Sequence, residues 1–150
     1  MKVKFTVLGE PRGKERPRFG KYSKHPITPE NTVLYENLVK TEYRRQCGDK
    51  QYPQGQPISV LIYAFYSIPK SASKKKQAMM LSGEIRPTKK PDYDNIGKVV
   101  CDSLNGIAYH DDSQVVDGLV RKFYSDRPRV CVIIEESEFV PELFEKIMSL

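Results

Sequence analysis

The sequence lacks any long apolar run, and this absence excludes membrane-spanning proteins. No stretch approaches the roughly 18 to 20 uninterrupted apolar residues that a membrane span requires. The first seven residues alternate polar and apolar side chains, as a strand does, rather than forming a signal peptide. We therefore expect a cytoplasmic protein with no membrane partner.

Cysteine is also scarce. The three cysteines, Cys47, Cys101 and Cys131, are far apart and form no Cys-x-x-Cys pair. This pattern argues against a disulfide framework or a zinc site, and we expect reduced, half-buried side chains. A glycine-rich phosphate loop is missing as well, and no organic cofactor is expected.

The length and composition predict one compact domain covering residues 1–150, because 150 residues with 39% hydrophobic side chains can bury a single core. The net charge of +6 is unevenly distributed. Residues 1–90 contain 19 Lys and Arg against 7 Asp and Glu, whereas residues 91–150 contain 6 against 12. The first part suits a polyanion and the second suits cations, although a charge excess alone is commonly just a solvated surface.

The strand patterns predict an α+β domain in which helices pack on a small mixed sheet. Residues 2–8 alternate with a period of two, as a half-buried strand does. Residues 58–66 are rich in β-branched and aromatic side chains and are the best candidate for a central strand. Residues 114–123 and 129–135 are predicted to be two more strands, joined by residues 125–128 into a hairpin.

The segment between the first strand and the first helix, residues 9–29, is expected to be a long exposed connection. It contains four prolines, three glycines and several basic residues. The helix that follows is predicted to start with Thr28 as its cap and Pro29 at its first position, and to end near Gly48. Its apolar side is predicted to consist of Val33, Leu34, Leu38 and Cys47.

Three further helices are expected. Residues 74–81 suggest a short basic helix and residues 141–148 a short C-terminal one. Residues 94–104 form a two-sided pattern. The polar side carries Asp94, Lys98 and Asp102, and the apolar side carries Ile96, Val99, Val100, Ser103 and Leu104.

Four aspartates stand in two tight pairs, Asp92 with Asp94 and Asp111 with Asp112. In an extended segment the carboxylates of Asp92 and Asp94 would point the same way, because side chains alternate along a strand. Paired carboxylates repel each other without a cation, and Mg²⁺ prefers oxygen ligands while keeping waters and substrate phosphate. Such a site suits phosphodiester hydrolysis, in which Lys98 would orient water or offset phosphate charge.

Each of these residues also has an ordinary structural role open to it. Asp94 or Asn95 is placed to cap a helix, and the Asp111-Asp112 pair to form a turn. Lys98 is spaced to pair with an aspartate four residues away. Asp102 is expected to be a solvated residue or a supporting neighbour. His110 is expected to hydrogen-bond to one of the acids beside it, outside the site.

At these acidic residues the sequence resembles the RusA family of Holliday-junction resolvases. The shared features are a Pro-Asp-x-Asp-Asn stretch at residues 91–95, Lys98 four residues after its second aspartate, and Asp111-Asp112 about twenty residues on. Residues 9–18 and Thr28-Pro29 also look like the family pattern, so the resemblance runs to about residue 134. Residues 135–150 show no feature of the family pattern.

The resemblance implies a homodimer with a mixed α/β fold that makes paired symmetric nicks across a four-way DNA junction, in DNA recombination and repair. It implies that Asp92, Asp94 and Asp112 bind Mg²⁺, for which Mn²⁺ can substitute, with Asp111 a lesser neighbour. It also implies that Lys98 assists catalysis.

The branched DNA is expected to be held by its phosphates. The residues predicted to line it are Arg12, Lys14, Arg16, Arg18, Lys74, Lys75, Lys76, Lys89 and Lys90.

Three other functions stay open. One is a binding module without catalysis, in which the exposed tyrosines Tyr22, Tyr52 and Tyr93 stack on single strands. Another is a metal-dependent nuclease for flaps or RNA, because its chemistry would be identical. The third is a sugar-nucleotide transferase, whose metal is also held by Asp-x-Asp, but a chain without a doubly wound pattern leaves little room for that fold.

Overall fold

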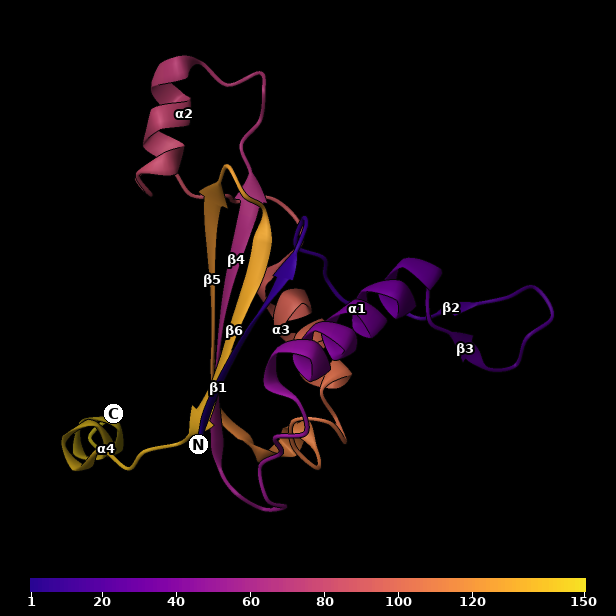
Figure 1. The fold of residues 1–150 in the computed structure, drawn as a ribbon, viewed down its shortest axis with the longest axis vertical. Helices are drawn as coiled ribbons and strands as arrows, with labels where there is room; N and C mark the ends of the chain where they lie inside the picture. Colours follow the sequence, from indigo (N-terminus) through magenta and orange to yellow (C-terminus); the bar gives the residue numbers. More distant parts are fainter.

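The computed structural model describes all of residues 1–150 as a four-stranded mixed sheet with helices on one face, which confirms the α+β prediction (Figure 1). The strand order is β1-β6-β4-β5. β6 runs antiparallel to both of its neighbours, whereas β5 is parallel to β4. The four strands are β1 (Lys2–Leu8), β4 (Ile58–Ser67), β5 (Val115–Ser125) and β6 (Arg129–Glu136).

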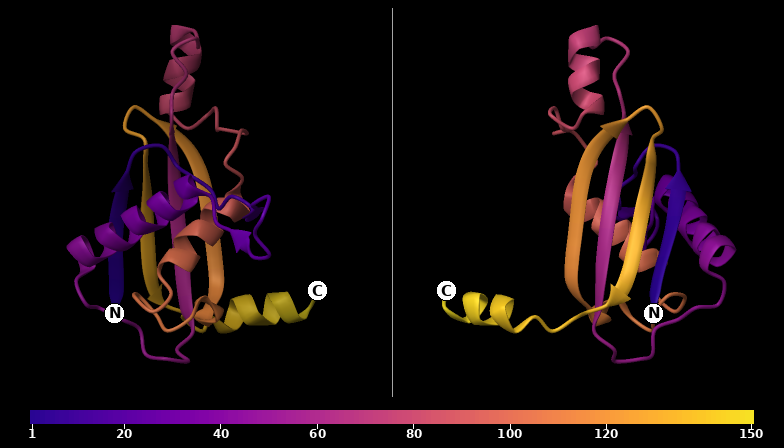
Figure 2. Two further views of the ribbon diagram at one scale, coloured as in Figure 1. Left: turned by 90° about the vertical axis from the view of Figure 1, so that its right-hand side faces the viewer. Right: turned by 60° about the vertical axis from the view of Figure 1, so that its left-hand side comes forward.

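The central position of β4 is confirmed, but the predicted hairpin of β5 and β6 is wrong. β4 lies between these two strands, and the chain crosses the end of β4 to pass from β5 to β6 (Figure 2). β5 has no buried residue and forms one edge of the sheet. Every second residue of β4 and β6, the two interior strands, is buried, and the edge strand β1 shows the same alternation.

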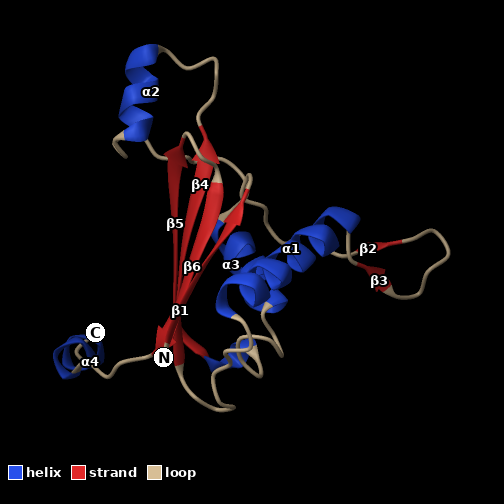
Figure 3. Ribbon diagram, viewed as in Figure 1, coloured by secondary structure: helices blue, strands red, loops and turns tan.

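Two helices cover one face of the sheet, α1 (Glu30–Cys47) and α3 (Tyr93–Ser103) (Figure 3). The predicted apolar side of α3 is confirmed, since all five of its residues are buried. All but Ser103 join a core cluster with the alternate residues of β1, β4 and β6 that point toward the helices. The other face of the sheet carries no helix over it.

The predicted buried side of α1 is wrong except for Cys47. The buried residues are Thr32, Tyr35, Val39, Tyr43 and Cys47, whereas Val33, Leu34 and Leu38 are 40–59% exposed. The tyrosine rings bury more apolar area than the leucines would, and Tyr43 packs edge-on against Phe5 with ring centroids 5.4 Å apart. The helix also begins later than predicted: Pro29 is the residue before its first turn and no side chain caps it.

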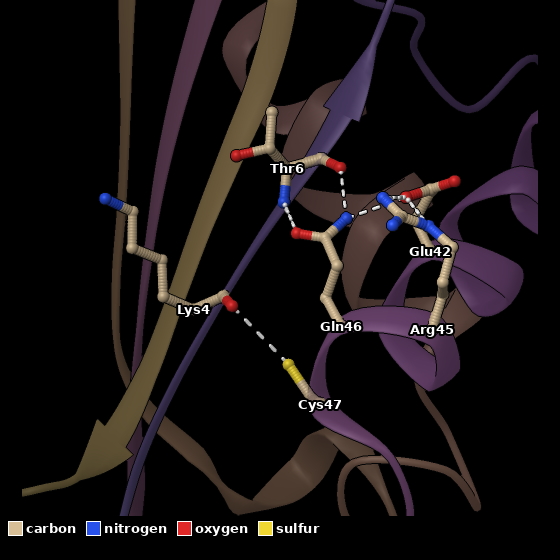
Figure 4. Close-up of polar contacts among 6 residues, drawn as sticks. All are labelled: Lys4, Thr6, Glu42, Arg45, Gln46 and Cys47. Carbon is tan, nitrogen blue, oxygen red and sulfur yellow. Dashed lines mark hydrogen bonds and ion pairs between the residues drawn. The ribbon is translucent and has the colours of Figure 1, made fainter.

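The end of α1 protects the free edge of the sheet at β1 (Figure 4). Thr6 donates its backbone N–H to Gln46 Oε1 at 2.9 Å and accepts a hydrogen bond from Gln46 Nε2 at 2.8 Å. Glu42 holds the amide in place, because Gln46 Nε2 also donates to it at 2.7 Å. The side chain of Gln46 thus replaces a neighbouring strand and blocks edge-to-edge pairing at this point.

Smaller elements stand outside this body. The long connection before α1 is exposed as expected, and it also forms a projecting two-stranded ribbon of β2 (Arg18–Phe19) and β3 (Pro26–Ile27). α2 (Lys74–Leu81) and α4 (Pro141–Met148) lie where they were predicted in the sequence.

The three cysteines are free, one buried and two half-buried. None of the helices has the length and apolarity needed to cross a membrane.

Candidate active site

The start of α3 presents two free carboxylates. The helix begins at Tyr93, so only Asp92 keeps the extended backbone that was expected for the whole motif, and Asp94 lies in the first helical turn. Asp92 occupies the capping position but its side chain makes no capping hydrogen bond, and neither Asp94 nor Asn95 caps the helix. Both aspartates are exposed beside the positive end of the helix dipole. They are therefore available to a ligand.

The basic loop before α1 lies directly against this acidic motif. Gly13 touches it so closely that an added Cβ would stand 2.9 Å from the Cβ of Asn95 and 3.0 Å from that of Pro91. Lys14 donates its backbone N–H to the Asn95 carbonyl at 2.9 Å. The oppositely charged parts of the sequence therefore meet, and glycine is required where they touch.

A polar cleft of about 670 Å³ opens between the two segments. Residues 11–18 of the loop form one wall, and Lys90, Pro91, Asp92 and Asn95 belong to the other. Asn31 and Thr32 at the start of α1 complete the lining. The cleft thus places basic side chains and a free carboxylate around one space.

Lys14 joins three elements beneath the cleft. Its ammonium lies 2.6 Å from Glu36 Oε1 on α1 and 3.1 Å from Asp102 Oδ2 on α3. Burial acts to lower the pKa of Lys14, but the contacts with the two carboxylates outweigh burial and raise the pKa above its usual value. Lys14 was predicted to contact DNA; in the structure two acids surround its ammonium.

The second acidic pair lies near the other end of α3. Asp112 donates its backbone N–H to Asn105 Oδ1 at 2.8 Å. Burial raises the pKa of the Asp112 carboxyl, and contact with the Asp102 carboxyl raises it further. Asp102 is therefore part of the site, and its place on the same side of α3 as Asp94 and Lys98 was the sequence signal for it.

Asp111 has the structural role that was left open for it. It precedes the short 3₁₀ helix η1 (Asp112–Gln114), and its carboxylate accepts a hydrogen bond from the Ser113 N–H at 3.2 Å. The Ser113 side chain, together with this backbone hydrogen bond, lowers the pKa of Asp111. His110 does not bond to an acid as expected, since its side chain is exposed and makes no hydrogen bond.

Lys98, the lysine predicted to assist catalysis, makes no contact with another charged side chain. It forms no ion pair with Asp94 or Asp102, although the four-residue spacing allows one. Its exposed ammonium lies on the helix between the two acidic groups, one turn from each aspartate. This position suits contact with a phosphate of a DNA strand that runs along the helix.

Lys122 is a further cation at the site that sequence reasoning missed. Its ammonium donates to the Lys89 carbonyl at 2.6 Å and lies 5.1 Å from the ring centroid of Tyr66, whose hydroxyl donates to the Pro91 carbonyl at 2.6 Å. Burial lowers the pKa of Lys122, and the negative charge of Asp92 opposes this shift. No local pattern reveals this contact, because it depends on the pairing of β5 with β4.

The aspartates offer the right donor chemistry for a hard cation, although they do not gather around one point. No three His, Cys, Asp or Glu side chains lie close enough to enclose a metal ion. Asp94 and Asp102 are two helical turns apart, about 12 Å along the axis. The contact between the Asp102 and Asp112 carboxyl groups is a place where a cation would relieve repulsion, which fits Mg²⁺.

Comparison with known proteins assigns the chain to a family. Residues 9–135 match the family of the endodeoxyribonuclease RusA. The chain belongs to the RusA family. It is also 43% identical over 141 residues to a Bacillus subtilis (strain 168) protein named "Uncharacterized protein YqaN", and the match covers 89% of this chain and 96% of YqaN. Membership of the RusA family implies endodeoxyribonuclease activity on branched DNA.

The basic residues predicted to hold DNA occupy two regions of this RusA-family chain. Arg12, Arg16, Arg18 and Lys90 line the cleft, with Lys89 next to it. The three lysines of α2, residues 74–76, lie beyond the end of the sheet. The structure therefore gathers one group of cations at the carboxylates and leaves the other apart.

The tyrosines expected to be exposed differ among themselves. Tyr22, at the tip of the ribbon, is 91% exposed and Tyr93 is 65% exposed. The expectation for Tyr52 is wrong, since it is buried and its hydroxyl donates to the Ile134 carbonyl at 2.7 Å. Tyr52 lies between α1 and a turn that contains proline and glycine, and the local sequence does not indicate that it is buried.

Proposed function

We propose that this RusA-family protein is a Mg²⁺-dependent, structure-selective endodeoxyribonuclease that resolves four-way DNA junctions by paired symmetric nicks. The observation that carries the proposal is the cleft in which the basic loop lies against the free Asp92 carboxylate. Phosphate-binding cations and metal-binding acids are both needed at a scissile phosphodiester, and the cleft brings them together.

The basic loop holds the DNA backbone. Arg12, Arg16 and Arg18 are exposed along the cleft, and guanidinium groups bind phosphate oxygens in pairs. Lys90 approaches from the opposite wall. These contacts position a strand without reading its sequence, which suits an enzyme that selects the shape of its substrate.

The acids hold the metal beside the DNA strand that is cut. Asp92 and Asp94 at the start of α3 would bind Mg²⁺, with Mn²⁺ a substitute, and Asp112 would bind a cation beside Asp102 at the other end of the helix. Asp111 would remain a neighbour that shapes the turn. When bound, the ion supplies an activated water and neutralises charge on the phosphate. Lys98 offsets charge on the phosphate from the middle of α3, and Lys122 adds positive charge near Asp92 from the sheet side.

Twofold symmetry would pair the cuts. A four-way junction is nearly symmetric, and a homodimer with a twofold axis places one cleft on each of two opposing strands. The free cysteines are suited to the reducing cytoplasm, where we propose that the protein acts.

The first test is cleavage of a labelled synthetic four-way junction beside duplex, flap, single-stranded and RNA controls, with Mg²⁺, Mn²⁺ or EDTA. We expect symmetric, metal-dependent nicks in the junction that Asp112→Asn abolishes while binding persists. Asp49→Asn is the matched control, because Asp49 is exposed at the far end of α1. Cuts of equal rate in EDTA, or in the Asp112→Asn protein, would refute the mechanism.

A binding module without catalysis remains the second candidate, and the exposed aromatic side chains of the ribbon favour it. Phe19 is 69% exposed and Tyr22 91% exposed, and both stand among basic residues, as in proteins that stack single-stranded bases. Tight junction binding without any cut in Mg²⁺ or Mn²⁺ would select this function. Cuts in flaps or RNA alone would select the other nucleases.

A further inference from the structure

The C-terminal helix α4 presents an apolar face that nothing in the chain covers. None of its residues is buried, and Leu143, Phe144, Ile147 and Met148 are 52–69% exposed. The chain is fixed only as far as Ser137, whose N–H donates to the Pro57 carbonyl at 3.1 Å and whose hydroxyl donates to Asp117 at 2.7 Å. Beyond that residue α4 stands away from the sheet (Figures 1 and 2). An isolated eight-residue helix is not stable in water, so this face needs a partner.

The uncovered face of the sheet is the second unpartnered apolar surface. The strand registers place Leu61 of β4 beside Leu119 of β5 and Ile133 of β6 on this face. Phe65 and Phe123 continue the row, with ring centroids 6.1 Å apart. Arg86 lies over the Phe123 ring, 4.4 Å from its centroid, and Arg129 lies over Phe65 at 4.0 Å. α1 and α3 both lie on the opposite face, and Figure 2 shows no helix over this one.

The charges of the two surfaces are complementary. α4 and the connection before it carry Glu138, Glu142 and Glu145 against one lysine, Lys146. The uncovered sheet face carries Lys4 on β1, Arg121 on β5 and Arg129 on β6, with Asp117 and Glu135 as its acids. An acidic apolar helix therefore matches a basic apolar sheet in both respects.

We propose that α4 is an arm that packs on the uncovered sheet face of a second copy of this chain. The arm leaves β6 at one end of the sheet and on the uncovered side, and it points away from its own strands. Twofold symmetry lets each copy place its arm on the other, so both apolar surfaces are buried twice in one closed interface. The inference rests on the proposed homodimer, and it is independent of the metal chemistry.

The exchange also explains why a dimer would be stable. A specific homodimer commonly buries about 800 Å² or more on each partner. The sheet face and the two arms together supply both apolar and charged side chains, as such interfaces commonly do. Residues 136–150 lie outside the range that matches the RusA family.

The first experiment changes the arm in the full-length protein. Phe144→Glu places a charge on the apolar face of α4, whereas the control Ser149→Glu places the same charge just beyond its last turn. We expect the first substitution to raise the dimer dissociation constant at least tenfold by sedimentation equilibrium, because buried aromatic anchors dominate such interfaces. The control should leave the constant unchanged. A dimer of unaltered affinity in the Phe144→Glu protein would overturn the inference.

The second experiment distinguishes a partner's sheet from the chain's own. Cys131 of β6 is half-buried on the uncovered face, and Ile147→Cys adds a thiol to the arm. We expect a short bis-maleimide reagent to join the two thiols into a species of dimer mass on a denaturing gel. Replacing Cys131 with Ser should remove that species. A cross-link that leaves the mass monomeric would place α4 on its own sheet and refute the arm.

The outcomes separate this inference from the proposed function. A full-length protein that is monomeric at micromolar concentration would remove both the homodimer and the arm, and junction cleavage would then be judged alone. A stable dimer that the Phe144→Glu substitution does not weaken, and in which α4 does not cross-link to the partner, would refute the arm. The proposed homodimer would remain supported.

Discussion

The ammonium of Lys14 lies 3.1 Å from the carboxylate of Asp102, which ties the basic loop to the last turn of α3. The same ammonium contacts Glu36, and Asp102 also touches the Asp112 carboxyl. One lysine therefore contacts two acids beneath the cleft, and one of these touches a third. The position of the loop over the acidic motif depends on this pairing, so binding and catalytic residues are coupled through it.

Lys14→Met should lower the free energy of unfolding by about 1–2 kcal/mol, because it leaves partly buried carboxylates without their counter-charge. The folded-state pKa of Lys14 is raised, so its stabilisation is present at neutral pH and is lost as the pH rises through that raised pKa. Urea denaturation at pH 7 and at strongly alkaline pH measures both effects. Lys24→Met is the control, since Lys24 is exposed in the ribbon loop. Equal losses for the two variants would contradict this account.

Gly13→Ala should displace the basic loop, because its new Cβ would stand 2.9 Å from the Cβ of Asn95. We expect a loss of about 1–3 kcal/mol of stability, as for other overpacked sites, together with weaker junction binding. The matched control is Gly118→Ala, where an added Cβ meets nothing within 4 Å. Thermal denaturation and a gel-shift titration would test the pair. Unchanged binding in the Gly13→Ala protein would show that the loop does not need this contact.

Asp112→Asn should stabilise the protein in EDTA, even though it abolishes the proposed activity. The folded-state pKa of Asp112 is raised, so the folded protein loses stability as the pH rises through that pKa, and asparagine removes the loss. A like-charge contact of a few tenths to about 1 kcal/mol corresponds to a melting temperature about 1–4 °C higher at pH 7.

The gain should shrink at acidic pH, where the carboxyl is protonated. Added Mg²⁺ should raise the melting temperature of the original protein but not that of the variant. A lower melting temperature for Asp112→Asn at pH 7 would show that the carboxylate contributes a favourable contact instead.

The sequence predicted the elements that repeat a local pattern and missed those that depend on distant pairing. The apolar side of α3 followed from its spacing, and the central position of β4 from its β-branched and aromatic composition. The side of α1 was predicted from its leucines, but two tyrosines fill the space over β1 instead. Which side chains of a helix are buried depends on the elements that pack against it. The sequence of the helix alone therefore does not predict the buried side.

The same limit applies to the site. The spacing of Asp92, Asp94, Lys98 and Asp112 indicated a metal-dependent chemistry before any fold was known. Lys122 reaches Asp92 only because β5 pairs in parallel with β4, so the sequence around it carries no sign of that role. The hairpin prediction for β5 and β6 failed for the same reason. The short connection would allow the two strands to pair, but β4, which is distant in the sequence, lies between them.

The basic residues should separate into two classes by their response to salt. Arg16 is exposed in the cleft wall, so Arg16→Ala removes one phosphate contact and should reduce the slope of log K against log salt by about 1. Lys14 is held by two carboxylates, so Lys14→Met should leave the slope unchanged even where it weakens binding. Junction binding by fluorescence anisotropy from about 50 to 200 mM salt measures both slopes.

Lys75→Ala extends the comparison to α2, beyond the end of the sheet. An exposed lysine that touches the arms of a junction away from the cut should lower the slope by the same amount as Arg16→Ala but leave the cleavage rate at saturating enzyme unchanged. Arg16→Ala should lower that rate as well, because its phosphate lies beside the acids. If the two substitutions reduced the cleavage rate at saturating enzyme equally, the result would contradict a cleft that alone binds the scissile phosphate. The lysines of α2 would then also contact the strand that is cut.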